Sequence, residues 1–282
     1  MKLAYSSNAY QRFSIKETVA RIAALGYAGL ELLADVPHAW PAGLLPQRRQ
    51  AIRACLAQHG LQVANVNGFM MNAVADPRQP YWHPSWIEPD RHYRAIRREH
   101  TCRALRLAAE LGAPSLQTEP GGPLDGQPWH AAAQVFYDEL MPCVEVAEQC
   151  GVSLLIEPEP GLMIETFEQY LEFVGRIGSP AVGLNFDIGH AFCVGQDPQH
   201  WIARMAPHTR HYHIEDIAAD RRHAHLIPGR GAIDLEAVLA EIDRSGYQGW
   251  VTVELYPYLD DPDAAGREAK QHLERLLGHR RP

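Results

Sequence analysis

The sequence predicts a single closed (β/α)8 barrel, and three observations lead to this prediction. Apolar, strand-like runs alternate with helical segments about eight times along the 282 residues. Most helical segments end at a glycine that stands just before the next strand. No shift in composition marks a boundary, so we expect one domain over residues 1–282. Alternation of this kind places a parallel sheet inside a layer of helices, and eight such units match a closed barrel.

An open, doubly wound sheet is the alternative fold for such a pattern. That fold normally carries a glycine-rich phosphate-binding turn directly after its first strand. Residues 5–10, which read Tyr-Ser-Ser-Asn-Ala-Tyr, contain no glycine. The pattern therefore favours the closed barrel.

The first half of the chain contains four strand–helix units, and the first unit shows the local signals most fully. A strand at 2–6 precedes a helix that starts at Ser14, where Ser14 and Glu17 have the spacing of a capping box. Val19 and Ile22 give this helix an apolar face, and Gly26 ends it. The next strands are expected at 29–33, 62–68 and 115–119, and the next helices at 46–59, 90–111 and 129–150.

The second half of the chain repeats the alternation of strands and helices, and the first half also contains one long irregular loop. Strand-like runs at 153–156, 183–186, 210–212 and 251–253 alternate with helices expected at 166–177, 197–205, 234–246 and 263–277. Residues 69–87 of the first half show no periodicity and hold Tyr81, Trp82, Trp86 and three prolines. Long loops of this kind in compact domains are often lids or binding loops, and a packed surface loop is the alternative.

Composition and charge exclude several classes of protein. The hydrophobic content of 46% and charged content of 21% are ordinary for a globular chain. A net charge of −8 provides no overall basic surface for nucleic acid. The five cysteines have no paired spacing, which indicates a reducing compartment. No run approaches the roughly 18 apolar residues that span a bilayer, and the N-terminus has no apolar leader segment, so we expect a cytoplasmic protein without a membrane partner.

Four successive strands end in residues that can ligate a metal. The fifth strand runs into Glu157, the sixth into Asp187, the seventh into His213 and the eighth into Glu254. The active site of a barrel lies at the carboxyl ends of its strands, and neighbouring strands are about 4.8 Å apart. Four such side chains can therefore converge on one ion, which would offset the cost of burying the carboxylates.

Each of these four residues has a second interpretation. Taken singly, a carboxylate at a strand end is more often a helix cap or an ion-pair partner, and only the coincidence on four neighbouring strands favours a metal site. Three carboxylates and one imidazole make an oxygen-rich donor set. This set favours Mn²⁺ or Mg²⁺, with Co²⁺ and Zn²⁺ as further candidates, over the thiolate-rich sites of structural zinc.

These motifs resemble those of the sugar phosphate isomerase/epimerase family, which is part of the xylose isomerase-like TIM barrel superfamily. The matching segments are Leu-Leu-Ile-Glu157-Pro, Asp187-Ile-Gly-His190, the run from His211 to Asp216, the loop 228–234 and Glu254. The resemblance covers nearly the whole chain. The same superfamily includes ketose 3-epimerases, inosose isomerases and dehydratases, and the endonuclease IV fold.

The resemblance implies a role for each matching position. Glu157, Asp187, His213 and Glu254 would ligate one divalent metal. Glu157 and Glu254 would also move protons, and His190 would contact a substrate oxygen near the metal. The metal would polarise a carbonyl and stabilise an enediolate, while a Glu removes the neighbouring proton as general base. Return of the proton gives an epimer or an aldose–ketose isomer, and loss of a β-hydroxyl gives a dehydratase.

Further residues are candidates for binding a small, polar, sugar-like substrate. His223 and His225 could bind a second metal or an anionic group, or could be exposed loop residues. Arg230 could hold a carboxylate or phosphate with its bidentate fork, or could face solvent. Trp86 could cover the face of a sugar, or could pack in the core.

Asn67 is a candidate for the wall of the substrate pocket, or for a position behind it that supports the residues in contact with substrate. It shares this assignment with three acidic residues near strand ends, namely Glu31, Glu119 and Glu159.

We therefore expect a metal-dependent isomerase or epimerase of a sugar, cyclitol or related polyol. A lyase of the same superfamily, of the 3-dehydroshikimate dehydratase or C-glycoside-cleaving type, is the main alternative. An endonuclease IV-like phosphodiesterase would need extra His ligands at the second and third strand ends, where the chain has Glu31, Leu33, Asn65 and Asn67. A non-catalytic metabolite-binding barrel would usually have lost one of the four ligands. The family often forms oligomers, so a homo-oligomer is a further expectation.

Overall fold

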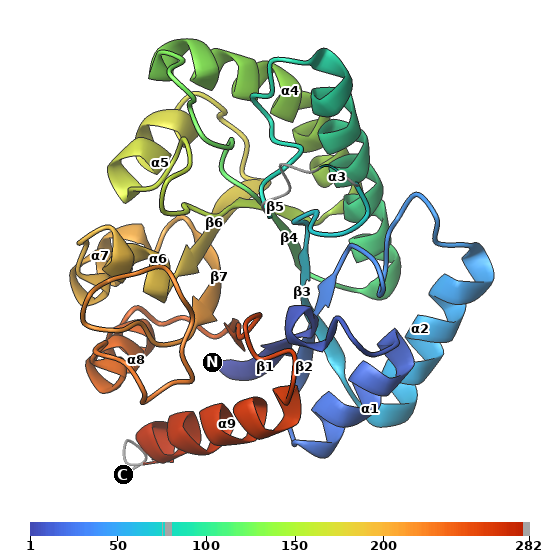
Figure 1. Ribbon diagram of the computed structural model, residues 1–282, viewed down its shortest axis with the longest axis vertical. Coiled ribbons are helices and arrows are strands. Elements are labelled where there is room, and N and C mark those ends of the chain that lie inside the picture. The colour runs from blue at the N-terminus through green and yellow to red at the C-terminus, as the bar shows by residue number, and fades with distance from the viewer. Residues whose placement is uncertain (75, 77–80, 279–282) are drawn as a thin grey trace.

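The computed structural model, which describes residues 1–74, 76 and 81–278, confirms the closed barrel. The described strands are parallel and follow one another in chain order around the barrel (Figure 1). Strand β8 pairs with β1 and closes the barrel. The strands are β1 (Lys2–Ser6), β2 (Gly29–Leu33), β3 (Gln62–Asn67), β4 (Ser115–Thr118), β5 (Ser153–Ile156), β6 (Val182–Asp187), β7 (Thr209–Ile214) and β8 (Trp250–Val253).

The helices form the outer layer of the barrel. They are η1 (Ser7–Tyr10), α1 (Ile15–Ala24), α2 (Pro46–His59), α3 (Arg91–Leu111), α4 (Trp129–Cys150), α5 (Phe167–Val174), α6 (Ile188–Cys193), α7 (Pro198–Met205), α8 (Leu235–Arg244) and α9 (Pro262–Gly278). The predicted capping box of Ser14 and Glu17 is present at the start of α1. Two short elements, η1 and α6, are absent from the sequence-based prediction because one or two turns give no usable periodicity.

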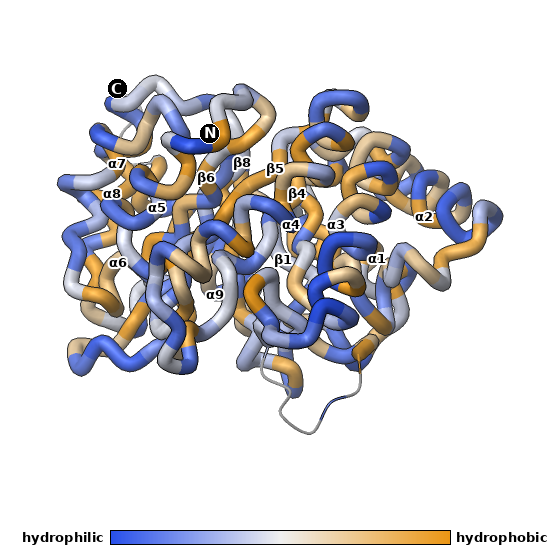
Figure 2. Tube along the Cα trace, turned by 90° about the horizontal axis from the view of Figure 1, so that it is seen from above, coloured by the Kyte–Doolittle hydropathy of each residue, from blue (hydrophilic) through white to orange (hydrophobic). Residues whose placement is uncertain are grey.

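The hydrophobic core lies between the strands and the helices. Phe186 of β6 meets Phe167 of α5 at a ring distance of 4.5 Å, and on the same layer it meets Tyr212 of β7 at 5.4 Å. Figure 2 shows hydrophobic stretches along the central strands and alternating hydropathy along the outer helices. Among the described residues, no helix combines the length and apolar character that a membrane crossing requires.

The interior of the barrel, by contrast, is a connected polar network. Asn65 of β3 donates to Glu31 of β2 at 3.0 Å and accepts from the hydroxyl of Ser115 of β4 at 2.7 Å. On the other side, His211 of β7 hydrogen-bonds Thr252 of β8 at 2.8 Å. Because these buried polar groups are paired with one another, the interior tolerates polar side chains. The side chains at the strand ends lie directly above this network.

Helix α3 holds two of the loops that rise from the barrel. The buried guanidinium of Arg97 donates to the carbonyls of Gly68 at 2.9 Å and Pro84 at 2.7 Å. One turn further on, the Nε2–H of His100 donates to the carbonyl of Ala34 at 2.8 Å. Burial and the neighbouring charge of Arg97 lower the pKa of His100 to about 3.

The pKa of His100 predicts an acid-sensitive fold. Because an unfolded chain binds a proton near pH 6.5 that the folded chain does not, the free energy of unfolding falls as the pH drops from about 6.5 toward about 3. This one group contributes a slope of up to about 1.4 kcal/mol per pH unit in that window. Chemical denaturation between pH 6.5 and 4.5 should therefore give a shallower dependence for His100→Gln. The exposed His59→Gln serves as control, and an equal slope in both variants would contradict the assignment.

Candidate functional site

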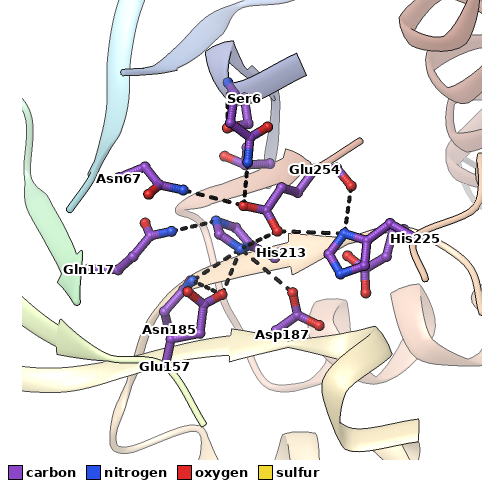
Figure 3. A network of polar contacts seen from close by, with 12 residues as sticks. Ser6, Asn67, Gln117, Glu157, Asn185, Asp187, His213, His225 and Glu254 are labelled. Atoms are coloured by element: carbon purple, nitrogen blue, oxygen red, sulfur yellow. Dashed lines mark hydrogen bonds and ion pairs between the residues drawn. The ribbon is translucent and has the colours of Figure 1, made fainter. Parts of the chain in front are cut away.

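His213 stands at the centre of the four predicted strand ends. Its Nε2–H donates to Glu31 at 2.7 Å, so its Nδ1 faces the opposite way. Around Nδ1 lie carboxylate oxygens of Glu157 at 2.7 Å, Glu254 at 3.5 Å and Asp187 at 3.6 Å (Figure 3). The structure thus brings together all four residues that the sequence singled out.

The local backbone explains how these side chains reach one point. Asp187 and His213 are direct neighbours across β6 and β7. Glu157 and Glu254 follow β5 and β8 immediately, at the same end of the barrel. Asp187 also caps α6, because its Oδ1 accepts the backbone N–H of His190 at 2.7 Å. A Cβ on Gly189 would lie 1.9 Å from the Glu215 carboxylate, which explains the glycine in this motif.

The electrostatics of the cluster call for a positive charge. Burial alone would lower the pKa of His213, but the charges of Glu31, Glu157 and Glu254 carry it well above its usual value. Burial raises the pKa of Glu254 well above the normal range; His213 opposes this shift, and the charges of Glu157, Glu31 and Asp187 add to it. One imidazole cannot neutralise the carboxylates that surround it.

These residues fit a divalent metal ion. Oδ2 of Asp187 is buried and has no hydrogen-bond partner among the described residues, although it faces Nδ1 of His213. The lone pairs of Nδ1 and of Glu157 also face each other at 2.7 Å, an arrangement that needs a cation or a proton between them. Ligands bound at about 2.1 Å to one ion stand roughly 3 to 3.5 Å apart, close to the spacings seen here. The donor chemistry is that of hard divalent cations.

Uncharged side chains hold the carboxylates in place. Asn185 donates to Oε1 of Glu157 at 2.7 Å. Asn8 and Asn67 donate to Oε1 of Glu254 at 2.8 and 3.3 Å, which leaves Oε2 facing His213. Second contacts of this kind orient ligands and tune their basicity. Asn67, which was expected either to line the pocket or to support the residues that do, hydrogen-bonds Glu254 from below.

A cavity of about 160 Å³, partly open to solvent, lies directly above this cluster. Its described polar lining consists of Glu157, Glu159, His190, His223, His225 and Glu254. Its described apolar and aromatic lining consists of Phe69, Met71, Tyr81 and Tyr256. Three of the latter belong to the irregular loop that was predicted to be a lid or binding loop, of which residues 75 and 77–80 lie outside the described part. Tyr256 follows Glu254 by two residues, a spacing that could have revealed it.

Three histidines converge on one side of this cavity. The rings of His190, His223 and His225 lie 4.6 to 5.6 Å apart. His190 and His225 use their Nδ1–H groups to donate to the carbonyls of Pro158 at 3.0 Å and Glu254 at 2.9 Å, so each Nε2 is left for the cavity. Each of the three residues offers one nitrogen within 4.8 Å of the others, a spacing that can hold an ion or a substrate oxygen.

His223 and His225 are uncharged near neutral pH. Burial and the proximity of the His190 and His225 imidazoles lower the pKa of His223 to about 2. Burial lowers the pKa of His225 to about 4, against the opposing effect of Asp187. Their buried Nε2 atoms have no hydrogen-bond partner in the described structure. The interpretation of both residues as exposed loop histidines is therefore wrong.

Two predicted substrate contacts lie away from the cavity. Trp86 is fully buried, stacks on Phe136 of α4 at 5.5 Å and donates its indole N–H to Thr118 at 2.9 Å. The core position buries the indole ring and gives its N–H an acceptor. Trp86 therefore packs in the core, which was the alternative to covering a sugar. Arg230 forms a bidentate pair with Glu268 of α9 at 2.6 and 2.7 Å on the outer surface.

The loop around Arg230 has a structural role. The carboxylate of Asp216 accepts the backbone N–H groups of Gly229 at 2.9 Å and Gly231 at 2.8 Å. A Cβ on Gly231 would lie 2.3 Å from Asp216, so the glycine is required for this close approach. The Gly-Arg-Gly turn wraps around a buried carboxylate and directs its arginine outward.

Comparison with known proteins gives the family. Residues 19–276 match the family model described as "Xylose isomerase-like TIM barrel". The chain belongs to this family. The resemblance inferred from the strand-end motifs is therefore confirmed.

The relatives include enzymes with different reactions. Fructoselysine 3-epimerase of Escherichia coli O157:H7 is 24% identical over 290 residues, which cover 98% of each chain. Inosose dehydratase of Geobacillus kaustophilus (strain HTA426) is 26% identical over 160 residues, and this match spans 50% of the present chain and 52% of the relative. A solved structure of an IOLI protein with a bound zinc atom has a TM-score of 0.80 at 20% identity, with 99% of both chains covered.

Asp35 fixes the loop that carries the cavity wall. Its carboxylate accepts the backbone N–H groups of Met71 and Asn72 at 2.6 Å each, and of Ala73 at 3.0 Å. The buried Asp35→Ala variant should lose all three bonds. Each hydrogen bond to a charged acceptor contributes about 1.5–3 kcal/mol, so we expect amide exchange at 71–73 to be at least about 10-fold faster.

Hydrogen–deuterium exchange with peptide resolution measures this effect. Asp35→Asn keeps one acceptor oxygen and should show a smaller increase. The exposed helix cap Asp90 gives a matched control, because Asp90→Ala should leave residues 71–73 unchanged. Unaltered exchange in Asp35→Ala would show that the loop is held by other contacts.

Proposed function

We propose that this chain is a divalent-metal-dependent isomerase or epimerase of a sugar, cyclitol or related polyol. The convergence of Glu157, Asp187 and Glu254 on Nδ1 of His213, beneath an open cavity, is the observation that carries the proposal. The relatives named above include an epimerase that matches the chain along 98% of its length. The oxygen-rich donor set supports Mn²⁺ as the ion.

The proposed site divides its work between ion and side chains. Glu157, Asp187, His213 and Glu254 would hold the ion. A bound divalent cation supplies Lewis-acid stabilisation of negative charge on substrate oxygens. Glu31 keeps Nδ1 of His213 directed at that position through its hydrogen bond to Nε2.

Glu157 and Glu254 are the proposed proton carriers. Both line the cavity, and they come from strands β5 and β8, so a substrate carbon between them is within reach of either. One carboxylate removes the proton from the carbon next to a carbonyl. A carboxyl group then returns a proton either to the opposite face of that carbon or to the neighbouring carbon. Asn185, Asn8 and Asn67 restrict the motion of these two carboxylates.

The residues that line the cavity favour an uncharged substrate. Neutral His223 and His225, with His190, offer nitrogen atoms to hydroxyl groups. Tyr81, Phe69 and Tyr256 can cover the less polar face of a ring and exclude water. Within the described lining, no Lys or Arg is available to pair with a phosphate.

A dehydratase is the second candidate function. The match to an inosose dehydratase favours it, and so does the position of Glu159. Oε1 of Glu159 lies 3.7 Å from His190 and 3.6 Å from His223 in the cavity wall. A carboxyl group there is placed to deliver a proton to a departing hydroxyl on the far side of the substrate.

Metal analysis tests the ligand set. Purified protein dialysed against Mn²⁺ should hold about one ion per chain at the four-ligand centre. Loss of a residue that only supports a ligand typically lowers metal affinity about 10–100-fold, so loss of a ligand itself should lower it at least as much. His213→Ala and Glu254→Gln should lose this ion, while the surface variant Arg230→Ala keeps it. Retention of the ion with full affinity in His213→Ala would reject the ligand assignment. A second equivalent that disappears in His223→Ala would assign an ion to the three histidines.

Solvent isotope exchange tests the reaction. Ketoses, inososes and dehydroshikimate-like acids incubated with the protein in D₂O should gain deuterium at the carbon next to the carbonyl. Glu157→Gln should slow this exchange by roughly 10²–10⁴-fold, because it removes a general base. Loss of water from the substrate would favour the dehydratase. The absence of both exchange and water loss with every candidate substrate would count against the proposed chemistry.

A further inference from the structure

Two cysteines meet where helices α3 and α4 pack against each other, away from the proposed active site. Sγ of Cys102 on α3 lies 3.1 Å from Sγ of Cys143 on α4. Figure 1 shows the two helices as neighbours on the outside of the barrel, and their contact is extensive. All five cysteines lie in the described part of the chain, and no other two of them are in such contact.

We propose that Cys102 and Cys143 form an oxidisable dithiol that closes to a disulfide between α3 and α4. A disulfide bond is about 2.05 Å long, so the two sulfur atoms need to approach each other by only about 1 Å. The cysteines are 41 residues apart in sequence, so the bond would link two separate helices of the folded protein. The remaining three thiols stay reduced in this proposal.

The surroundings assign different roles to the two thiols. Cys102 is partly exposed, whereas Cys143 is buried. Arg98 and Arg106 stand one turn before and one turn after Cys102 on α3. The hydrogen bond from Cys143 lowers the pKa of the Cys102 thiol, and the two arginines add to this effect against burial. A thiolate is the reactive form of cysteine, so Cys102 is the group that meets the oxidant.

The oxidant is a hydroperoxide, and the reaction balances in two steps. The Cys102 thiolate attacks the peroxide oxygen, which gives a sulfenic acid and releases water or an alcohol. The sulfur of Cys143 then attacks the Cys102 sulfur, the S–S bond forms, and the sulfenic hydroxyl leaves as water. Two thiols are oxidised by two electrons in total, the peroxide is reduced by two electrons, and the thiol protons end in the released molecules.

The bond would tether the helix that holds the loops above the barrel. Arg97 and His100 of α3 bind the carbonyls of Gly68, Pro84 and Ala34 from positions within two turns of Cys102. Their neighbour Cys143 belongs to α4, whose Phe136 supports Trp86. Oxidation therefore acts on the packing behind the cavity and leaves the ligand cluster untouched.

Peroxide titration of the intact folded protein tests the proposal. Under denaturing thiol titration, the free thiols should fall from five to three, and the intact mass should decrease by that of two hydrogen atoms. Peptide mapping without reductant should find Cys102 linked to Cys143, and dithiothreitol should restore all thiols. The melting temperature of the oxidised protein should be equal or higher, by roughly 5 °C for a bond that closes without strain.

Matched variants separate the pair from general oxidation. Cys102→Ser and Cys143→Ala should each abolish the mass loss, while Cys55→Ser, which removes a cysteine on α2, should retain it. The inference is overturned if peroxide adds only oxygen to Cys102, if the linked peptide contains another cysteine, or if all five thiols persist at peroxide levels that oxidise a small dithiol. A large fall in melting temperature on oxidation would show that the helices cannot accommodate the bond.

Discussion

The structure depends on a group of buried carboxylates that surround one imidazole. Glu31, Glu157, Asp187 and Glu254 all lie within 3.6 Å of a His213 nitrogen. Removing a charge from water costs several kcal/mol even after the protein relaxes, and like charges this close repel each other. Asparagine amides, Ser6 and the backbone N–H of His190 satisfy several of their oxygens, which helps the barrel to keep them together. The repulsion between these carboxylates also favours the binding of a divalent cation among them.

The polar interior of the barrel and the residues at the strand ends form one hydrogen-bonded network. Glu31 links the two, because it accepts from Ser6, Asn65 and His213. A change deep in the barrel, at Asn65 for example, would alter the basicity of His213 through Glu31. The cavity above differs in kind, since His223 and His225 are uncharged and part of its described lining is aromatic. Such side chains suit the polar, uncharged substrate that we propose.

Much of this arrangement could be predicted from the sequence. Alternating apolar runs and glycine-terminated helices were sufficient for the barrel, since both are local signals of parallel α/β architecture. The place of Glu157, Asp187, His213 and Glu254 in one cluster followed from the rule that strand ends share one face. The motifs that contain Asp216 and Gly229 could be recognised in the sequence. The contact between these two residues could not be predicted, because a loop separates them.

Contacts between distant residues could not be predicted. Nothing in the residues near Glu31 indicates a hydrogen bond to His213, 182 positions away. Trp86 was ambiguous because an aromatic residue in an irregular loop suits a substrate wall as well as a core, and only the packing of Phe136 decides. Arg230 has the right chemistry for an anion, and its direction is set by Asp216, which draws the turn inward. His223 and His225 became cavity residues because their loop turns back on itself, where Leu226 pairs with Asp216, and because His225 bonds the carbonyl of Glu254.

Anomalous X-ray diffraction from crystals grown with Mn²⁺, recorded on either side of the manganese absorption edge, tests the central claim most directly. The account predicts one strong peak at about 2.2 Å from Nδ1 of His213 and from oxygens of Glu157, Asp187 and Glu254. A strong peak elsewhere, with no density at this centre under saturating Mn²⁺, would contradict it.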